Sequence, residues 1–507
     1  MTTGADLPAP ARNPRGTMET AASPAGGETA GTSRPIAGLL PLVAGAVIFL
    51  VLILAGANLL NDPDTYWHIA TAEWIFANGF PTTDSFSSTY AGEPWIAKEW
   101  LSQVLYALAF RLGGWTGVVA LAAAAFAATI ALLARALERT LASIEVITCL
   151  CAAFMLAAPH VVARPHLLVL PVVLCWTAGL VRALDGDGKP PFLILPLMTL
   201  WANLHGSFLL GLLLAGAAAL ESLVAAAPGT RRKVFAAWSL FGIAAVAAAC
   251  VTPYGLGTAA AALDVLRLGD LLPAVDEFRP PDFSKPSPLE FILLAAIGVA
   301  VWRGVRLPPV RILVILGLVH LALSGERYAE TLGLLAPLYL AAPLARQFPE
   351  MASKAPKARA DGRSVIAGLV LLAVAAVAVA GFARTDPSPN ARISPVAAVA
   401  AIKAANVGPV LNDYDFGGYM IAARLPTFVD GRAELYGETF LLRYRNAVLL
   451  SDLAGLIRIL DEYGIRATLF SPAIPIVAWL DREPGWKRLY ADGIAVVHVR
   501  TGEAAPN

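Results

Sequence analysis

Two aspartates flank a single proline directly after a long apolar run, and they are the most chemically suggestive residues of the chain. Asp62 and Asp64 lie in the segment Asn61-Asp62-Pro63-Asp64-Thr65-Tyr66-Trp67-His68. Because Pro63 fixes the backbone between them, we expect the two carboxylates to lie close together. Such a pair can bind a divalent cation (Mg²⁺ or Mn²⁺) through oxygen ligands, or act as a catalytic base that deprotonates an acceptor hydroxyl. A simpler interpretation is that one of them only caps the helix predicted over residues 64–78.

Arginine and histidine side chains lie in other turns, at the ends of apolar runs. Arginines there can bind a phosphate or diphosphate through several hydrogen bonds, and histidines can assist acid–base chemistry or phosphate contacts. Ionisable groups at membrane depth are costly, so their recurrence in several turns indicates a functional site. The predicted substrate-binding residues of this set are His68, Arg164, His166, His205, Glu277, Arg279 and Arg327. Alternatively, the arginines only snorkel at the membrane interface, paired with Glu277 or Glu326.

Acidic turns follow two predicted strands near the end of the chain. Asp413 and Asp415 follow the first of these strands, and Asp430 and Arg432 follow the next. Ligands tend to bind at the carboxyl ends of strands in α/β layers, so all four residues are predicted to contact substrate. Ordinary turn chemistry explains the same residues equally well, because Asp and Gly favour turns in any domain.

The composition indicates that a membrane-embedded scaffold must position these residues. Of 507 residues, 57% are apolar and only 15% are charged, and the mean hydropathy is +0.65. The net charge of +1 gives no reason to expect a nucleic-acid partner. All four cysteines fall in apolar runs, so neither a disulfide framework nor a cysteine metal site is expected. Membrane lipid is therefore the predicted surrounding of most of the chain.

Eleven apolar runs within residues 37–383 are predicted to be membrane spans. They cover roughly residues 37–59, 115–136, 142–159, 166–183, 191–204, 207–226, 233–252, 289–303, 309–324, 327–345 and 364–383. With residues 1–36 as a disordered cytoplasmic leader, Lys and Arg concentrate in the cytoplasmic loops. Two placements decide this orientation. Trp100–Leu112 is interpreted as an interfacial helix, and 191–226 as two spans that turn at Asn203-Leu204-His205-Gly206.

A composition typical of soluble domains returns after the last span. Residues 384–507 are predicted to form a small extracytoplasmic α/β domain. Its expected strands are 410–411, 427–429, 467–470 and 494–499. The first external loop, 60–99, carries the Asp-Pro-Asp segment on the same side of the membrane. The predicted fold is therefore an α-helical polytopic membrane protein with a small C-terminal α/β domain.

This arrangement resembles the class C (GT-C) superfamily of membrane glycosyltransferases. The shared features are a first helix with a cytoplasmic N-terminus, an aspartate in the first external loop, many further spans and an external C-terminal domain. In that superfamily a loop aspartate acts as catalytic base or binds metal, and the donor is a saccharide linked to a polyprenyl phosphate. By position, the resemblance assigns these roles to Asp62 and Asp64.

The C-terminal region is similar to the catalytic subunit of oligosaccharyltransferase, which has a Trp-Trp-Asp-Tyr-Gly motif shortly before a Val-Asp-Asn stretch. Asp413-Tyr414-Asp415-Phe416-Gly417 and Val429-Asp430-Gly431 occupy comparable places, but only Asp415 and Gly417 match the pentapeptide. Because both tryptophans are replaced, asparagine glycosylation is not predicted. The chain also looks like a group of uncharacterised bacterial multi-pass proteins that share DPD-x-x-W-H, W-x-N-x-H-G and D-G-R motifs. This likeness implies a bacterial inner membrane location.

Two functions from different classes are consistent with these patterns. The first is an inverting-type transferase that moves a sugar from a polyprenyl-phosphate donor to an extracytoplasmic glycan, lipid or protein, in cell-envelope glycoconjugate synthesis. The second is a non-catalytic membrane scaffold or transport component of envelope polysaccharide assembly. Transport predicts charged residues near the middle of several spans, whereas these spans are mostly Ala, Leu and Val. A polar site at one membrane face therefore favours the transferase.

Overall fold

The computed structural model describes residues 39–266, 279–354 and 362–501. From Ile36 onward the chain forms one compact unit. The predicted leader 1–36 and the predicted site residue Glu277 lie outside the described residues. The predicted division of the chain after residue 383 remains a prediction.

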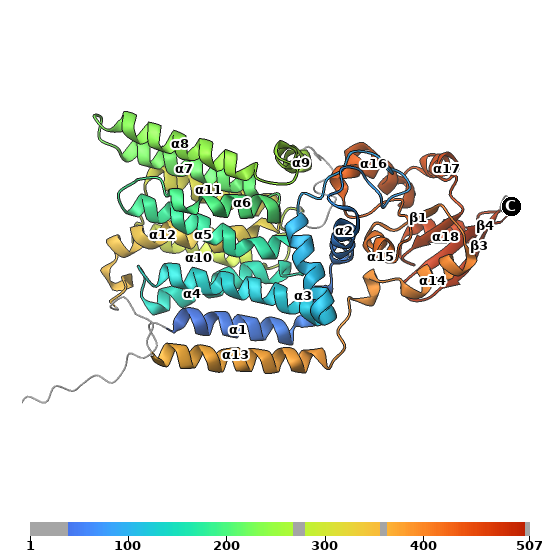
Figure 1. Ribbon diagram of the computed structural model, residues 1–507, viewed down its shortest axis with the longest axis horizontal. Helices are drawn as coiled ribbons and strands as arrows, with labels where there is room; N and C mark the ends of the chain where they lie inside the picture. The colour runs from blue at the N-terminus through green and yellow to red at the C-terminus, as the bar shows by residue number, and fades with distance from the viewer. Residues whose placement is uncertain (1–38, 267–278, 355–361, 502–507) are drawn as a thin grey trace, which may run out of the picture. The chain divides into compact units, whose positions relative to one another are not determined.

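Most of the described chain is helical, and its first half forms a bundle of helices (Figure 1). These helices are α1 (Leu40–Leu54), α2 (Asp64–Asn78), α3 (Trp100–Leu137), α4 (Ser143–Ala157), α5 (Pro165–Asp185), α6 (Leu195–Leu204), α7 (Phe208–Ala225), α8 (Arg231–Ala249), α9 (Leu256–Leu266), α10 (Pro288–Arg303), α11 (Pro309–Ser324), α12 (Tyr328–Gln347) and α13 (Gly362–Ala383). The turn predicted at His205 is confirmed, because α6 ends at Leu204 and α7 begins at Phe208.

Six helices in the described part of the chain are long and apolar enough to cross a membrane, by length and composition. They are α3, α4 with its short 3₁₀ extension to His160, α5, α7, α8 and α13. Each of the eleven predicted apolar runs coincides with a helix, but several helices, such as α1 with 15 residues, are short for a full span. The chain is therefore a mostly helical multi-pass membrane protein, whereas the count of eleven spans and the orientation remain predictions.

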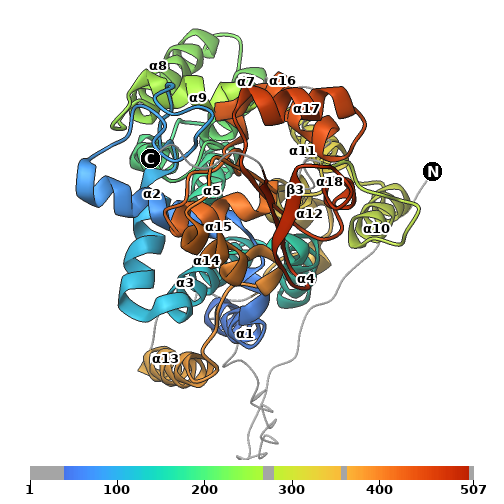
Figure 2. The same ribbon diagram turned by 90° about the vertical axis from the view of Figure 1, so that its right-hand side faces the viewer.

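Apolar side chains cover the outside of several helices, as expected where helices contact lipid. On α13, Leu369, Leu372 and Val377 are each more than 60% exposed. Figures 1 and 2 both show α13 running beside α1 at the outside of the helix bundle. A soluble protein rarely exposes so much contiguous apolar surface, but a lipid bilayer is a favourable surrounding for it.

A glycine pair divides α3 into two helical segments. Gly113 and Gly114 leave the helical conformation, and Gly114 has a positive φ of 57° that favours glycine. This break separates Trp100–Leu112 from the apolar run that follows. The sequence predicted both segments as separate elements, and the break confirms that separation.

The C-terminal region contains a four-stranded sheet with the order β1-β2-β4-β3. The strands are β1 (Val410–Asn412), β2 (Ala467–Phe470), β3 (Trp486–Ala491) and β4 (Val496–Arg500), and the helices are α14 (Val396–Ala405), α15 (Gly417–Ala422), α16 (Ala433–Val448), α17 (Leu453–Glu462) and α18 (Pro475–Leu480). β1 pairs with β2 in parallel, with Val410 opposite Ala467, whereas the other two pairs are antiparallel. Helix α16 and strand β3 were not predicted.

The predicted strand at 427–429 is wrong, because the loop 60–99 takes the backbone hydrogen bonds of this segment. The amide of Thr427 donates to Phe86 O at 3.2 Å, and the amide of Ser88 donates to Thr427 O at 2.8 Å. Next to it, the amide of Phe428 donates to Asn412 Oδ1 at 2.7 Å. The segment therefore joins the first loop to the C-terminal region.

A fully buried arginine completes this junction. Arg432 is 0% exposed, and its guanidinium donates to Asp84 Oδ1 at 2.5 Å, to Asp430 Oδ1 at 2.8 Å and to Asp430 Oδ2 at 2.7 Å. The Tyr436 hydroxyl donates to Asp430 Oδ2 at 2.7 Å, and the guanidinium carbon lies 4.8 Å from the ring centroid of Trp95. Buried charges persist only when they are paired in this way. The first loop and residues 430–436 thus form one rigid wall.

Candidate active site

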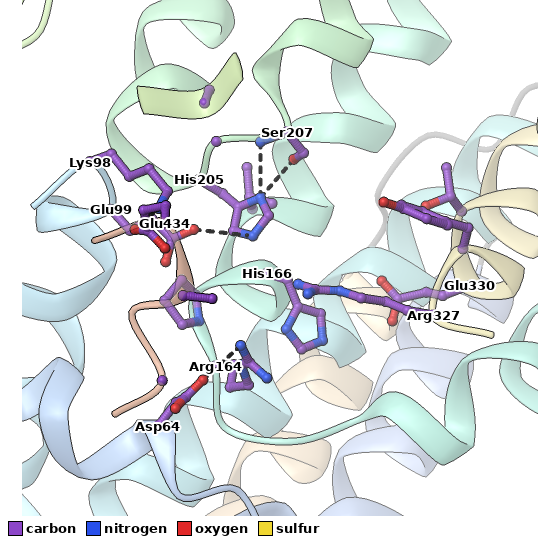
Figure 3. A pocket seen from close by; sticks show the side chains of 18 of the residues that line it. Asp64, Lys98, Glu99, Arg164, His166, His205, Ser207, Arg327, Glu330 and Glu434 are labelled. Carbon is purple, nitrogen blue, oxygen red and sulfur yellow. Dashed lines mark hydrogen bonds and ion pairs between the residues drawn. The ribbon is translucent and has the colours of Figure 1, made fainter. Parts of the chain in front are cut away.

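A cavity of about 680 Å³ lies between the helix bundle and this wall. Its polar part is lined by the Asp-Pro-Asp segment, by Lys98 and Glu99 of the first loop, and by residues at the ends of α5, α6 and α12 (Figure 3). Residues of the C-terminal region, including Tyr414 and Glu434, line the same space. The two regions therefore build one site together.

The other part of the cavity is apolar. Its lining side chains come from α5, α7 and α12 and include Val169, Leu170, Val173, Leu209, Leu210, Leu213, Leu334 and Leu335. A cavity that joins an ionisable end to a long aliphatic end suits a ligand that is itself polar at one end and apolar at the other.

Arg164 bridges the two aspartates. Its NH1 lies 3.1 Å from Asp62 Oδ2, and its NH2 lies 2.9 Å from Asp64 Oδ2. Arg164 precedes Pro165, the first residue of α5, so a proline at the helix start sets the position of the guanidinium. The other oxygen of Asp62, Oδ1, accepts the backbone N–H of Asp64 at 2.9 Å. This contact fixes the backbone before α2, whose N-cap residue is Pro63 and has no side-chain cap. Asp62 also binds Arg164.

Asp64 is only 8% exposed, and its surroundings have opposing effects on the pKa of its carboxyl group. Burial disfavours the charged form and raises the pKa of Asp64 from 3.8 to about 7, although the guanidinium of Arg164 lowers it. The charge of Asp62 raises the pKa further. A carboxyl with this pKa can take up and release a proton near neutral pH.

A histidine with a defined tautomer stands opposite Asp64. The backbone N–H of Ser207 donates to His205 Nδ1 at 3.1 Å, so the ring proton lies on Nε2. Nε2 lies 3.3 Å from Glu99 Oε1, so its N–H is next to this carboxylate oxygen (Figure 3). Burial lowers the pKa of His205 well below 6.5, and burial also raises the pKa of Glu99. Beside this pair, Lys98 forms an ion pair with Glu434.

His68 lies on the same side of the cavity as Asp64. It is buried on α2 one turn after Asp64, and its Nδ1 accepts from Gln103 Nε2 at 3.3 Å. Burial lowers the pKa of His68 well below 6.5, and the charges of Arg164 and Lys98 lower it further. His68 is therefore a neutral ring that offers Nε2–H as a donor.

The structure brings most of the predicted site residues together. Eight of them line the cavity: Asp62, Asp64, His68, Arg164, His166, His205, Arg327 and Asp415. Arg279 is exposed and lies outside the cavity lining, and its carbonyl accepts the amide of Glu326 at 3.0 Å. Asp413 accepts the amides of Asp415 and Ser471 at 3.3 and 3.2 Å and is also outside the lining. The substrate contacts of all these residues remain predictions.

Asp430 and Arg432 are turned toward each other and toward Asp84, away from the cavity lining. Their neighbours in sequence, Gly431 and Ala433, do line it. The ion pairs of Asp430 and Arg432 hold this wall together. The substrate contact predicted for these two residues stays a prediction.

Several cavity residues were not among the predicted site residues: Lys98, Glu99, Ser207, Glu330, Tyr414 and Glu434. Glu330 carried a usable signal, because it is a carboxylate in the first turn of the apolar helix α12. The sequence around Glu434 gave no such signal, since its ion pair with Lys98 joins residues that are 336 positions apart.

The Asp-Pro-Asp segment does not fit the predicted divalent cation. Both carboxylates already bind the guanidinium of Arg164, whose positive charge stands where a metal ion would stand. Among the described residues, no group of three His, Cys, Asp or Glu side chains is arranged to hold a metal ion. A hard cation such as Mg²⁺ requires more oxygen ligands than the two aspartates retain.

Glycines let the C-terminal region approach Asp64 closely. A Cβ atom on Gly431 would lie 1.9 Å from Asp64 Oδ1, and one on Gly418 would lie 2.1 Å from Pro63 O. Both distances are far inside van der Waals contact, so only glycine fits at these positions. The D-G-R turn therefore forms part of the surroundings of the Asp64 carboxylate.

We expect Gly431→Ala to lower the free energy of unfolding by about 1–3 kcal/mol, because the added methyl group must displace the Asp64 carboxylate from its place beside Arg164. The measurement is thermal or denaturant unfolding of the purified protein in detergent. Gly298→Ala on α10 is the matched control, since a Cβ there meets no atom within 4 Å. Equal stability of the two variants would show that Gly431 does not constrain Asp64.

Comparison with solved structures shows a related fold. No family model and no curated protein matches the sequence. The archaeal oligosaccharyltransferase AglB from Archaeoglobus fulgidus, in complex with an inhibitory peptide and a dolichol-phosphate, matches with a TM-score of 0.53 and 10% identity, over 85% of this chain and 69% of AglB. ArnT from Cupriavidus metallidurans bound to undecaprenyl phosphate matches with a TM-score of 0.47 and 15% identity, over 93% of this chain and 99% of ArnT. The likeness to AglB extends over most of this chain and shows a shared fold.

Proposed function

We propose that this chain is a membrane glycosyltransferase that moves a sugar from a polyprenyl-phosphate donor to an acceptor hydroxyl. The observation that carries the proposal is a single cavity with a carboxyl of pKa about 7 at its polar end and aliphatic side chains at its other end. A polyprenyl-phosphate sugar likewise has a polar end, formed by sugar and phosphate, and an apolar end, formed by the isoprenoid chain. AglB, whose fold this chain shares, binds a dolichol-phosphate.

In the proposed reaction, the ionised Asp64 removes the proton of the acceptor hydroxyl while the oxygen attacks the anomeric carbon of the donor sugar. The bond from this carbon to the phosphate oxygen breaks, and the polyprenyl phosphate leaves with the electron pair. Direct displacement inverts the anomeric configuration. The proton rests on Asp64 and is then released to water.

Three further groups support this step. Arg164 fixes the direction of the Asp64 carboxylate through its 2.9 Å contact. The neutral His205 keeps Glu99 in place, and Arg327 at the start of α12 supplies positive charge to the departing phosphate. Because a phosphate is a good leaving group, positioning and charge stabilisation supply most of the catalysis. No step requires a metal ion.

The proposal includes a location that the loop charges support. The Asp-Pro-Asp segment faces the extracytoplasmic side of a bacterial inner membrane, with a cytoplasmic N-terminus, and the acceptor is a glycan, lipid or protein of the cell envelope. The donor's isoprenoid chain lies along the aliphatic side chains of α5, α7 and α12, where it enters from the bilayer.

Transfer by the purified protein tests the proposal. In nanodiscs, decaprenyl phosphate that carries a radiolabelled sugar is supplied with envelope lipids and glycans as acceptors. We expect label to move to an acceptor and decaprenyl phosphate to be released, at the same rate with and without EDTA. A loss of activity in EDTA that Mn²⁺ restores would contradict the metal-free mechanism. Absence of donor binding would refute the transferase itself.

A further inference from the structure

Two side chains in the cavity hold acceptor atoms without a hydrogen-bond partner in the protein. Glu330 is 4% exposed, and its Oε2 has no partner; His166 is 8% exposed, and its Nδ1 has none. Both residues line the cavity, and Figure 3 shows them with Arg327 on the side of the site opposite Glu99. Buried polar atoms nearly always have a partner, so these two atoms indicate a ligand.

The hydrogen bond of the other ring nitrogen defines what His166 can offer. His166 Nε2 lies 3.1 Å from the carbonyl oxygen of His160, which can only accept, so the ring proton lies on Nε2. A second proton would add another positive charge to a buried cavity that already holds Arg164 and Arg327. His166 Nδ1 therefore carries a lone pair and accepts a hydrogen bond.

Glu330 offers the same chemistry. A carboxyl group keeps at least one accepting oxygen in either protonation state. Glu330 stands in the first turn of α12, three residues after Arg327, so the backbone of one helix start fixes both side chains. The cavity thus has an arginine, which only donates, next to two groups that accept.

Groups in the cavity that donate hydrogen bonds and groups that accept them suit different parts of a ligand. Phosphate oxygens accept hydrogen bonds, so a phosphate satisfies Arg327 but cannot satisfy His166 Nδ1, which also accepts. Hydroxyl and amino groups donate, and they satisfy both acceptors. The sequence left acid–base assistance and phosphate contact open for His166, and its tautomer does not suit the phosphate.

We propose that Glu330 and His166 form a sugar-recognition subsite that accepts hydrogen bonds from hydroxyl or amino groups of the transferred sugar. This inference rests on the proposed function, and it adds which part of the donor lipid these two residues bind. The lipid phosphate lies beside them, against the arginines. The subsite sets which sugar the protein accepts, and it contributes little to binding of the lipid carrier.

Competition binding in nanodiscs tests this assignment. Radiolabelled decaprenyl phosphate is displaced by unlabelled decaprenyl phosphate, by decaprenyl-phosphate-mannose or by decaprenyl-phosphate-glucosamine. We expect wild type to bind at least one sugar-bearing lipid about tenfold more tightly than the bare phosphate, because hydrogen bonds to the two buried acceptors together contribute about this much. A preference for mannose indicates hydroxyl recognition, and a preference for glucosamine indicates recognition of the amine.

The variants Glu330→Leu and His166→Phe remove the accepting atoms, so they should lose this preference and still bind bare decaprenyl phosphate as wild type does. Glu326→Gln is the matched control, since Glu326 is exposed on the preceding turn and does not line the cavity. Equal weakening of the bare phosphate and the sugar-bearing lipids would overturn the subsite and leave the transferase proposal standing. If wild type binds no probe at all, the proposed function fails as well.

Discussion

Asp64→Asn is expected to lower the rate of sugar transfer about 10³-fold, within the range that a general base contributes. The amide keeps the shape of the side chain but cannot accept the proton of the acceptor hydroxyl. Binding of decaprenyl phosphate should change little, because the apolar lining from α5, α7 and α12 is untouched. Glu73→Gln is the matched control, since Glu73 is an exposed carboxylate on the same helix, paired with Arg111.

The pH dependence of the wild-type rate gives an independent readout. With a pKa of about 7, Asp64 is mostly protonated below pH 7, so the rate should fall about tenfold for each pH unit below that value. Above pH 7 the base form dominates and this dependence levels off. A rate that stays constant down to pH 5 would remove Asp64 from the proton transfer, whatever the variant shows.

Arg432→Met is expected to lower the free energy of unfolding by about 3–5 kcal/mol, because it leaves the carboxylates of Asp84 and Asp430 buried without their counter-charge. The measurement is the thermal or denaturant unfolding of the protein in detergent. Transfer activity should fall with it, since the Gly431 turn loses its support.

The control for this loss is an arginine of the same region with an exposed partner. Arg443 on α16 pairs with Glu462, and both side chains are in contact with solvent. Arg443→Met should therefore cost less than about 1 kcal/mol, as exposed ion pairs do. A loss as large as that of Arg432→Met would show that the buried network has no special weight.

The parts of this fold that could be predicted from sequence are those with local signals. The turn at His205 interrupts an apolar stretch that is too long for one span, and the Gly113–Gly114 break follows from two adjacent glycines. The Asp-Pro-Asp segment was found because proline and two acidic residues follow an apolar run. In each case, residues within one or two helical turns determine the structure.

The parts that could not be predicted depend on contacts between distant segments. Residues 427–429 have the apolar composition of a strand, but Phe86 and Ser88 pair with the backbone of Thr427, and the Asn412 side chain accepts the amide of Phe428. The D-G-R turn was predicted as a set of ligand-binding side chains, whereas the residue of this turn that lies against Asp64 is Gly431, which has no side chain. A sequence pattern does not show that a position requires glycine because a neighbouring group leaves no space for a side chain.

The ion pair between Asp84 and Arg432 also has a consequence for biosynthesis. These two residues are 348 positions apart, so Asp84 leaves the ribosome long before its partner exists. During this interval the first loop has a carboxylate with no counter-charge and cannot adopt its buried conformation. The helix bundle can insert first, but the cavity is complete only after residue 445 has been synthesised, because Leu441, Tyr444 and Arg445 also line it. A chain that stops earlier is therefore a membrane protein without a finished site.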